Sequence, residues 1–272
     1  MRLTLAQIGA GTDKKRNLEV VAGLARAAGA AGADLIAFPE YTMYDKKAVD
    51  STFAAEAEPL DGQFVDGLRA LAVQLNLTIV AGVVESNSDD RRPYNTLFAV
   101  GPTGAILARY RKVHLFDSFG FRESEFIRPS DSLEPVTFAA GDFTVGLMTC
   151  YDLRFPEQAR AIADAGAQLM LACSSWVPGT GKVDQWKILA QARAIENSSY
   201  FGAVSQTPPI SIGHSLLVDA MGRVIGEFGE TADAKLFDID LDSVHDARKL
   251  NPALDQRRYP RFTGDPVGRS AQ

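Results

Sequence analysis

Apolar runs of strand length alternate along this chain with segments whose apolar residues recur at helical spacing. Helices are predicted near residues 17–31, 64–75, 155–165 and 184–196. Strands are predicted near residues 3–8, 34–38, 77–84, 94–100, 105–110, 143–148, 169–173, 200–205, 214–219 and 224–228. Turn sequences at 101–104 and 220–222 join some of the strands as hairpins. This order predicts an α/β protein with two sheets covered by helices, rather than one doubly wound sheet.

The length and composition favour one large core. The chain has 272 residues, of which 46% are hydrophobic, and no linker or repeat divides it. We therefore expect a single domain over residues 1–272. The tail from 251 to 272 is rich in proline and arginine and has few residues for a core, so we expect it to pack on a neighbouring subunit.

Charge and cysteine content limit the partners and the compartment. The formal charge is −6, from 28 basic and 34 acidic residues, and no basic stripe is present, which argues against nucleic acid or an anionic membrane as a partner. Two cysteines without framework spacing suit a reducing compartment. The first residues enter a strand without a signal-peptide pattern, and no apolar run reaches about 18–20 residues. A cytoplasmic location is expected.

Three predicted strands end in residues that can carry chemistry. Cys150 follows the run 143–148, Glu40 follows the short strand before Pro39, and Lys112 follows a strand that ends near Tyr110. Each residue alone has a plain explanation, as a core thiol, a surface or capping acid, and a solvated ammonium. Together they supply a nucleophile, a proton carrier and a fixed positive charge, which is a coherent set for covalent catalysis.

The sequences around these residues resemble one known superfamily. They read Phe-Pro-Glu-Tyr at Glu40, Arg-Lys-Val-His-Leu-Phe-Asp at Lys112 and Cys-Tyr-Asp-Leu-Arg-Phe-Pro-Glu from Cys150. From about Leu3 to Tyr259 the chain is similar to the nitrilase, or carbon–nitrogen hydrolase, superfamily. It most resembles the Nit branch, which includes omega-amidases and deaminated-glutathione amidases. The resemblance implies a four-layer α-β-β-α sandwich that pairs into a homodimer or a higher homo-oligomer.

The resemblance also implies a role for each reacting group. Cys150 would be the nucleophile that forms a thioester, and Glu40 the general base that later protonates departing ammonia. Lys112 and the backbone N–H of Tyr151 would stabilise the oxyanion of the tetrahedral intermediate. No metal or cofactor is expected, because the three histidines lack ligand spacing and no glycine-rich phosphate loop follows a strand.

A further carboxylate and a further cation are candidates for supporting roles. By resemblance, Glu123 would position the lysine and the substrate, with Glu125 as the rival for that role. Arg154 lies four residues after the nucleophile and could clamp a substrate carboxylate. It could equally pair with Asp152 or Glu157 and hold the turn together, and the sequence favours this structural role.

The next predicted strand end supplies candidates for the pocket wall. Ser174, Ser175 and Trp176 leave that strand and are expected to line the pocket. Cys173, just before them, is expected to be a packed core thiol. Gln185 stands where many Nit-like sequences have a histidine, which puts close equivalence of substrate in doubt.

We therefore expect hydrolysis of a small linear amide that carries a carboxylate, giving an acid and ammonia. The same residues could hydrolyse a nitrile or an N-carbamoyl amine. A catalytically silent binding or scaffold protein on this fold is the alternative from another class. A papain-like protease with His214 as base is disfavoured, because the motifs of that family are missing.

Overall fold

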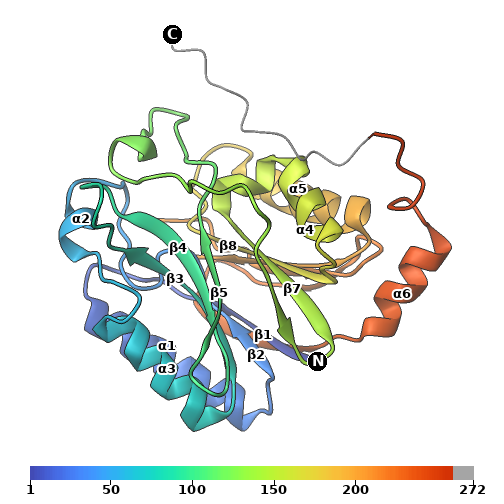
Figure 1. Ribbon diagram of the computed structural model, residues 1–272, viewed down its shortest axis with the longest axis horizontal. Helices are drawn as coiled ribbons and strands as arrows, with labels where there is room; N and C mark the ends of the chain where they lie inside the picture. Colours follow the sequence, from blue (N-terminus) through green and yellow to red (C-terminus); the bar gives the residue numbers. More distant parts are fainter. Residues whose placement is uncertain (260–272) are drawn as a thin grey trace.

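Two six-stranded β-sheets form the centre of the molecule (Figure 1). The structure is a computed structural model, and it describes residues 1–259. In the first sheet the parallel strands β1 (Arg2–Gln7), β2 (Leu35–Ala37) and β3 (Thr78–Glu85) are central. β12 (Asp233–Asp238) pairs antiparallel with β1, and β4 (Tyr94–Val100) and β5 (Ile106–Arg111) extend the other edge.

The second sheet repeats this plan. Its central strands β7 (Phe143–Thr149), β8 (Leu169–Ser174) and β9 (Tyr200–Ser205) are parallel. β6 (Thr137–Ala140) lies antiparallel to β7, while β10 (Leu216–Val218) and β11 (Val224–Glu227) complete the opposite edge. Both sheets therefore place the carboxyl ends of three parallel strands along one side of the molecule.

Helices cover the outer face of each sheet (Figure 1). α1 (Lys14–Ala30) and α3 (Gln63–Leu75) pack on the first sheet, and α4 (Pro156–Asp164) and α5 (Lys182–Asn197) on the second. The remaining helices are α2 (Thr52–Glu56), the 3₁₀ helices η1 (Glu123–Glu125) and η2 (Cys150–Arg154), and α6 (Leu241–Leu250). At the start of α1, the Asp13 carboxylate accepts the Arg16 backbone N–H at 3.0 Å and caps the helix.

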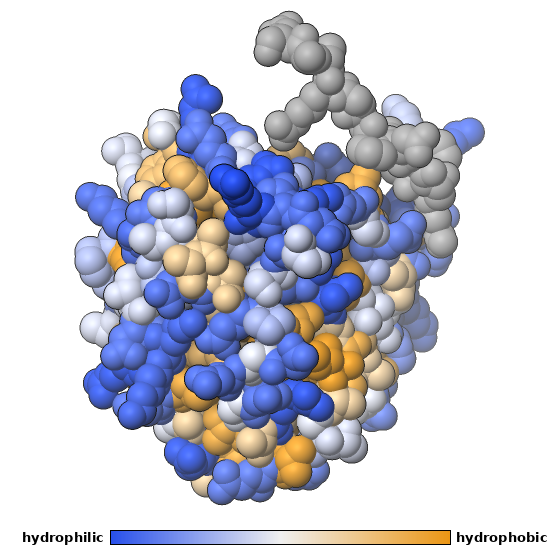
Figure 2. Space-filling view, turned by 60° about the vertical axis from the view of Figure 1, so that its left-hand side comes forward, coloured by the Kyte–Doolittle hydropathy of each residue, from blue (hydrophilic) through white to orange (hydrophobic). Residues whose placement is uncertain are grey.

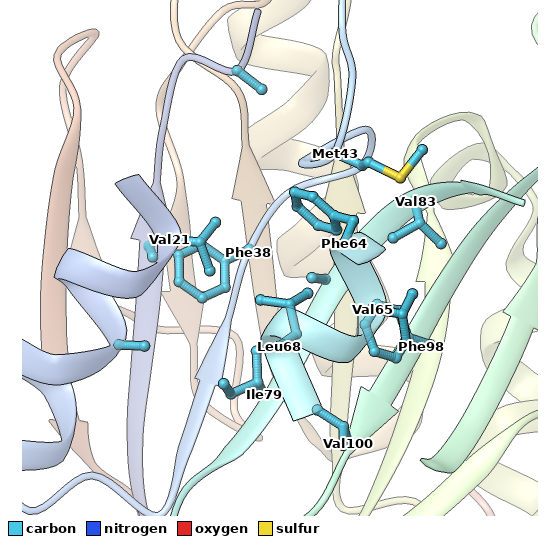
Figure 3. Packing of buried hydrophobic residues seen from close by; sticks show 14 of the residues in the cluster. Val21, Phe38, Met43, Phe64, Val65, Leu68, Ile79, Val83, Phe98 and Val100 are labelled. Atoms are coloured by element: carbon cyan, nitrogen blue, oxygen red, sulfur yellow. The ribbon is translucent and has the colours of Figure 1, made fainter. Parts of the chain in front are cut away.

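Three separate apolar clusters hold the layers together. One lies between α1, α3 and the first sheet, where Leu68 lies beside Ile79 and Val65 beside Phe98 (Figure 3). A second joins the inner faces of the two sheets, and a third joins the second sheet to α4 and α5. Fully burying each large apolar side chain contributes about 1.5–3 kcal/mol. Three apolar interfaces require four layers, so the predicted α-β-β-α sandwich is confirmed.

Two elements near the C-terminus were not predicted. Residues 233–238 form β12, whose backbone pairs with β1 along its whole length, and residues 241–250 form α6. β12 is half-buried at an edge of the sheet and lacks a clear alternation of apolar residues, which explains why the pattern missed it. The predicted hairpin turns at 101–104 and 220–222 are present, each closed by a backbone hydrogen bond of 2.9 Å.

The first part of the C-terminal tail lies against its own chain. The Arg257 guanidinium makes two hydrogen bonds, of 2.5 and 3.0 Å, to the carboxylate of Asp164 at the end of α4. Residues 260–272 lie outside the described residues, so packing of the tail on a neighbouring subunit stays a prediction.

Hydrophilic residues cover most of the face shown in Figure 2, with apolar residues in small groups among them. Within residues 1–259, no helix has the length and apolar character needed to cross a bilayer.

Candidate active site

The carboxyl ends of β2, β5 and β7 open into one pocket. Glu40, Lys112 and Cys150 all line it, although 72 positions separate the first two in sequence. Including the part open to solvent, the hollow measures about 680 Å³. Its size suits a small substrate. The three residues therefore converge in space, as the sequence led us to expect.

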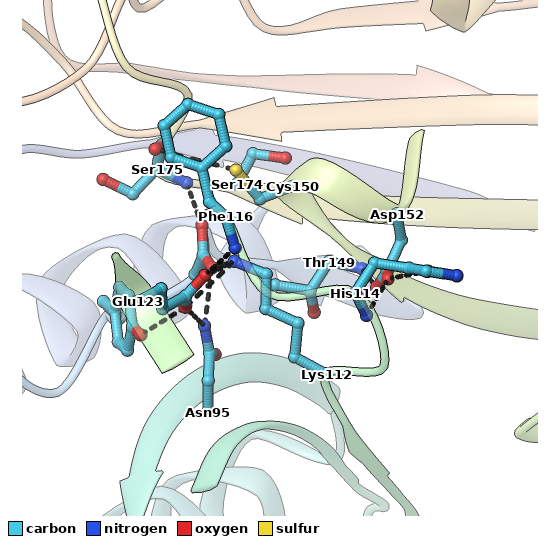
Figure 4. Close-up of polar contacts among 12 residues, drawn as sticks. Asn95, Lys112, His114, Phe116, Glu123, Thr149, Cys150, Asp152, Ser174 and Ser175 are labelled. Carbon is cyan, nitrogen blue, oxygen red and sulfur yellow. Dashed lines mark hydrogen bonds and ion pairs between the residues drawn. The ribbon is translucent and has the colours of Figure 1, made fainter. Parts of the chain in front are cut away.

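Lys112 lies between two buried carboxylates (Figure 4). Its Nζ is 2.9 Å from Oε1 of Glu40, and 3.1 and 2.9 Å from the two oxygens of Glu123. All three residues are at most 5% exposed. Burial disfavours the ammonium, but the negative charges of Glu123 and Glu40 outweigh it and raise the pKa of Lys112 well above its usual value. Lys112 is therefore a permanent cation.

Neighbouring groups fix the position of Glu40. Asn95 Nδ2 donates to Oε1 at 2.6 Å, and the backbone N–H of Ser175 donates to Oε2 at 2.5 Å. Gln206 Nε2 also donates to the backbone carbonyl of Glu40 at 2.9 Å. A Cβ at Gly82 would lie 2.7 Å from the Glu40 Cα, so only glycine permits this close approach of β3 to the Glu40 backbone. Two of these donors therefore hold the carboxylate, and the third holds the backbone of Glu40.

Cys150 occupies a strained turn at the end of β7. Its φ of +48° lies in the left-handed region, which costs a non-glycine residue about 1–3 kcal/mol. Its Sγ points toward the Ser175 carbonyl at 3.7 Å (Figure 4). Burial, followed by the charge of Glu40, raises the pKa of the Cys150 thiol, while Lys112 opposes that rise. Burial and Glu40 therefore favour the protonated form of this thiol.

A buried network around Asp152 holds this turn. Asp152 accepts the Thr149 backbone N–H at 2.9 Å, the His114 backbone N–H at 3.0 Å and the Tyr110 hydroxyl at 2.5 Å. Tyr151 follows Cys150 in the first turn of η2, where backbone N–H groups have no partner within the helix. The Tyr151 N–H is therefore free of a partner within the helix, which is compatible with the predicted hydrogen bond to an oxyanion.

Arg154 does not pair with Asp152 or Glu157, so the structural pairing favoured from sequence is not found. Its guanidinium instead donates to Oε1 of Gln185 at 2.6 Å and lies 5.0 Å from the centre of the Trp176 ring. Arg154 lines the pocket and, among residues 1–259, makes no ion pair with a carboxylate.

The other predicted supporting residues divide into those that reach the pocket and those that do not. Glu123 does, whereas Glu125 is exposed and lies 3.7 Å from Arg122. Ser175 and Trp176 line the pocket. Ser174 does not: as the last residue of β8 it is fully buried, because successive strand residues face opposite sides.

Asp45 anchors the loop that carries Ser175. It accepts the Ser175 hydroxyl at 2.9 Å and is 2% exposed. Burial raises the pKa of Asp45 well above its usual range, the Ser175 hydrogen bond opposes the rise, and Glu40 adds to it. Since the Ser175 backbone binds Glu40 and faces Cys150, this contact helps to position both side chains.

Sequence reasoning missed four residues that the structure brings to the site: Tyr41, Asp45, Asn95 and Lys182. Tyr41, which donates to Glu123 at 2.9 Å, could have been suspected from its place beside Glu40. Asn95 is a polar residue within a predicted strand, which is a weak signal. Asp45 and Lys182 lie in a loop and at a helix start, where no periodic pattern indicates direction.

Comparison with known proteins matches most of the chain. A model of the carbon–nitrogen hydrolase family covers residues 2–249. Hydrolase Rv0480c of Mycobacterium tuberculosis (strain H37Rv) is 39% identical over 264 residues, which cover 91% of this chain and 92% of that protein. Omega-amidase NIT2 of Mus musculus is 31% identical over 272 residues, 96% of each chain. The C. elegans NitFhit structure has a TM-score of 0.86 and 30% identity, and covers 94% of this chain and 65% of that one. This chain therefore spans about two thirds of NitFhit.

Proposed function

Since the chain belongs to the carbon–nitrogen hydrolase family and resembles its Nit-like branch, we propose that it converts a small linear amide bearing a carboxylate into an acid and ammonia. That it is a hydrolase of carbon–nitrogen bonds follows from the family. The observation that carries the proposed mechanism is the placement of Lys112 between Glu40 and Glu123, at hydrogen-bond distance from both and in the same pocket as the Cys150 thiol.

The first half of the reaction forms a thioester. Glu40 removes the thiol proton as Cys150 Sγ attacks the amide carbon, because the thiol of Cys150 is protonated at rest. The tetrahedral intermediate then collapses. Its C–N bond breaks as Glu40 returns the proton to nitrogen, and ammonia leaves.

The second half releases the acid. Glu40 takes a proton from a water molecule, whose oxygen attacks the thioester carbon. The C–S bond breaks, the carboxylic acid departs and Glu40 gives the proton back to sulfur. The hydrogen bonds from Asn95 and Ser175 keep the carboxylate in place for both halves.

Lys112 supplies the positive charge for both tetrahedral intermediates. Since it is paired before substrate arrives, no reorganisation is needed when the oxyanion forms. The Tyr151 backbone N–H is the second donor in this proposal. Glu123 orients Lys112 and accepts the Phe116 backbone N–H at 2.7 Å, which ties the lysine to the loop after β5.

The preference for a carboxylate-bearing amide rests on two observations. The relative named omega-amidase acts, by its name, on a terminal amide, and the pocket here has cationic residues at Arg154 and Lys182 without carboxylate partners among the described residues. An anionic substrate is complementary to such a surface.

The test is ammonia release from 2-oxoglutaramate, 2-oxosuccinamate and deaminated glutathione by the unaltered protein and by Cys150→Ala. We expect a loss of roughly 10⁴-fold or more on at least one of these substrates. Cys173→Ala, which removes a buried thiol outside the pocket, should retain turnover. Full activity of Cys150→Ala would refute the assigned nucleophile. Release of carbon dioxide with ammonia from an N-carbamoyl amine, and no amide turnover, would instead favour the carbamoyl alternative.

A further inference from the structure

Lys182 is a buried cation that takes no part in the proposed bond-breaking steps. It is the first residue of α5, is 7% exposed and lines the pocket. Its Nζ lies over aromatic rings, 4.0 Å from the centre of Phe119, 5.2 Å from Phe116 and 5.7 Å from Trp176. Within residues 1–259, no carboxylate forms an ion pair with it.

This environment leaves the positive charge of Lys182 only partly compensated. Lysines are almost never fully buried without a partner, because an unpaired charge loses its hydration. Aromatic rings compensate part of that loss. Burial, followed by the nearby Arg154, lowers the pKa of Lys182. An anion placed beside the ammonium would relieve both effects.

Arg154 adds a second cation to the same side. It and Lys182 both lie near the Trp176 ring, and its hydrogen bond to the neutral amide of Gln185 holds it without cancelling its charge. We call Arg154, Trp176 and Lys182 the cationic wall. Gln185, which occupies the position of a histidine in many similar sequences, thus holds Arg154 in the wall through a hydrogen bond.

Another part of the pocket has a different charge balance. We call Glu40, Lys112, Glu123 and Cys150 the floor, where two carboxylates face one ammonium. The floor repels an anion and the wall attracts it. A substrate with an amide at one end and an anion at the other is therefore oriented with its amide at Cys150.

We propose that Lys182 binds the distal carboxylate of the substrate and selects anionic amides over neutral ones, with Arg154 as its neighbour in the cationic wall. This inference rests on the proposed function for the identity of the reacting end. Lys182 acts on specificity and not on the bond that breaks.

The experiment compares amides that differ only in the charge of the far end. Succinamate and glutaramate carry a carboxylate, whereas succinamide and glutaramide have the same lengths with a neutral amide there. Lys182→Met keeps the length of the side chain and its contact with the rings, but removes the charge. We expect its KM for the preferred carboxylate substrate to rise about 10- to 100-fold, with kcat and the diamide kinetics nearly unchanged.

Two further variants control this result. Lys182→Arg should recover part of the carboxylate preference. Lys15→Met removes an exposed lysine of α1 and should behave like the unaltered protein. Equal losses on carboxylates and diamides in Lys182→Met would indicate a structural role and overturn the proposal, as would an unchanged KM for the carboxylate.

A binding measurement separates this inference from the proposed function. Calorimetry of succinate and glutarate with the unaltered protein should show binding that weakens about 10- to 100-fold in Lys182→Met. If no amide is hydrolysed but this weakening is seen, the proposed function fails, while the carboxylate site at Lys182 stands. If amides are hydrolysed but both proteins bind the dicarboxylates equally, or neither binds them, the inference fails alone.

Discussion

The floor and the wall of the pocket each contain a buried lysine, yet the two lysines are held in opposite ways. Lys112 lies within 3.1 Å of two carboxylates, whereas Lys182 is surrounded by aromatic rings and a second cation. The neighbouring charges accordingly raise the pKa of Lys112, and burial with Arg154 lowers that of Lys182. A cation that is already paired belongs to machinery that is complete before substrate binds. The charge of an unpaired cation is compensated only when a ligand brings the opposite charge.

The largest expected effects come from replacing each lysine in turn, which tests whether the two lysines have different roles. Lys112→Met should lower kcat/KM for glutaramate and glutaramide alike, by about 10²–10³-fold, because both share the oxyanion. Lys182→Met should affect only the carboxylate. Steady-state kinetics on the two substrates measures the contrast, and thermal unfolding checks that Lys112→Met is folded despite its two unpaired buried carboxylates. A substrate-selective effect of Lys112→Met would contradict the separation of roles.

A smaller effect is expected from the acid that orients Lys112. Glu123→Gln keeps the shape of the side chain but leaves Lys112 with one carboxylate, so kcat should fall about 10- to 100-fold on both substrates. Glu125→Gln, two residues away and exposed, is the matched control and should be unchanged. Equal losses in the two variants would remove the distinction that the geometry draws between them.

The smallest effect concerns pH. The relevant quantity is kcat/KM for glutaramate divided by that for glutaramide, since titration of the floor affects both substrates and cancels. Lys182 attracts the carboxylate only in its charged form. The ratio should therefore fall, by about tenfold or less, as pH rises through the lowered pKa of Lys182. That fall should begin below the ordinary lysine value of 10.5 and be missing in Lys182→Met. A flat ratio up to pH 10.5 would show that this charge is not used.

Much of the fold was accessible from the sequence because its main elements are locally specified. Residues 143–149 form a strand buried on both faces, as their continuous apolar run predicted, and α3 buries the apolar face that its spacing indicated. β12 was missed because an edge strand is defined by the neighbour with which it pairs. Its partner β1 lies more than 220 residues earlier in the chain.

The same division holds within the site. The strand ends identified Glu40, Lys112 and Cys150, because each follows an apolar run whose direction fixes where the next residue lies. No comparable local pattern distinguishes Glu123 from Glu125, and none indicates where the Arg154 side chain points. The backbone of the loop after β5 binds Glu123, and Gln185 binds Arg154. Both contacts exist only in the folded molecule.

The sequence by itself determined the layers of the sandwich and the three groups proposed for the chemistry, since hydrophobic periodicity and strand ends are properties of neighbouring residues. Only the tertiary structure decided which lysine is paired and which is not. The charge state and partners of a buried group depend on atoms that approach from distant parts of the chain, and no local pattern encodes that approach.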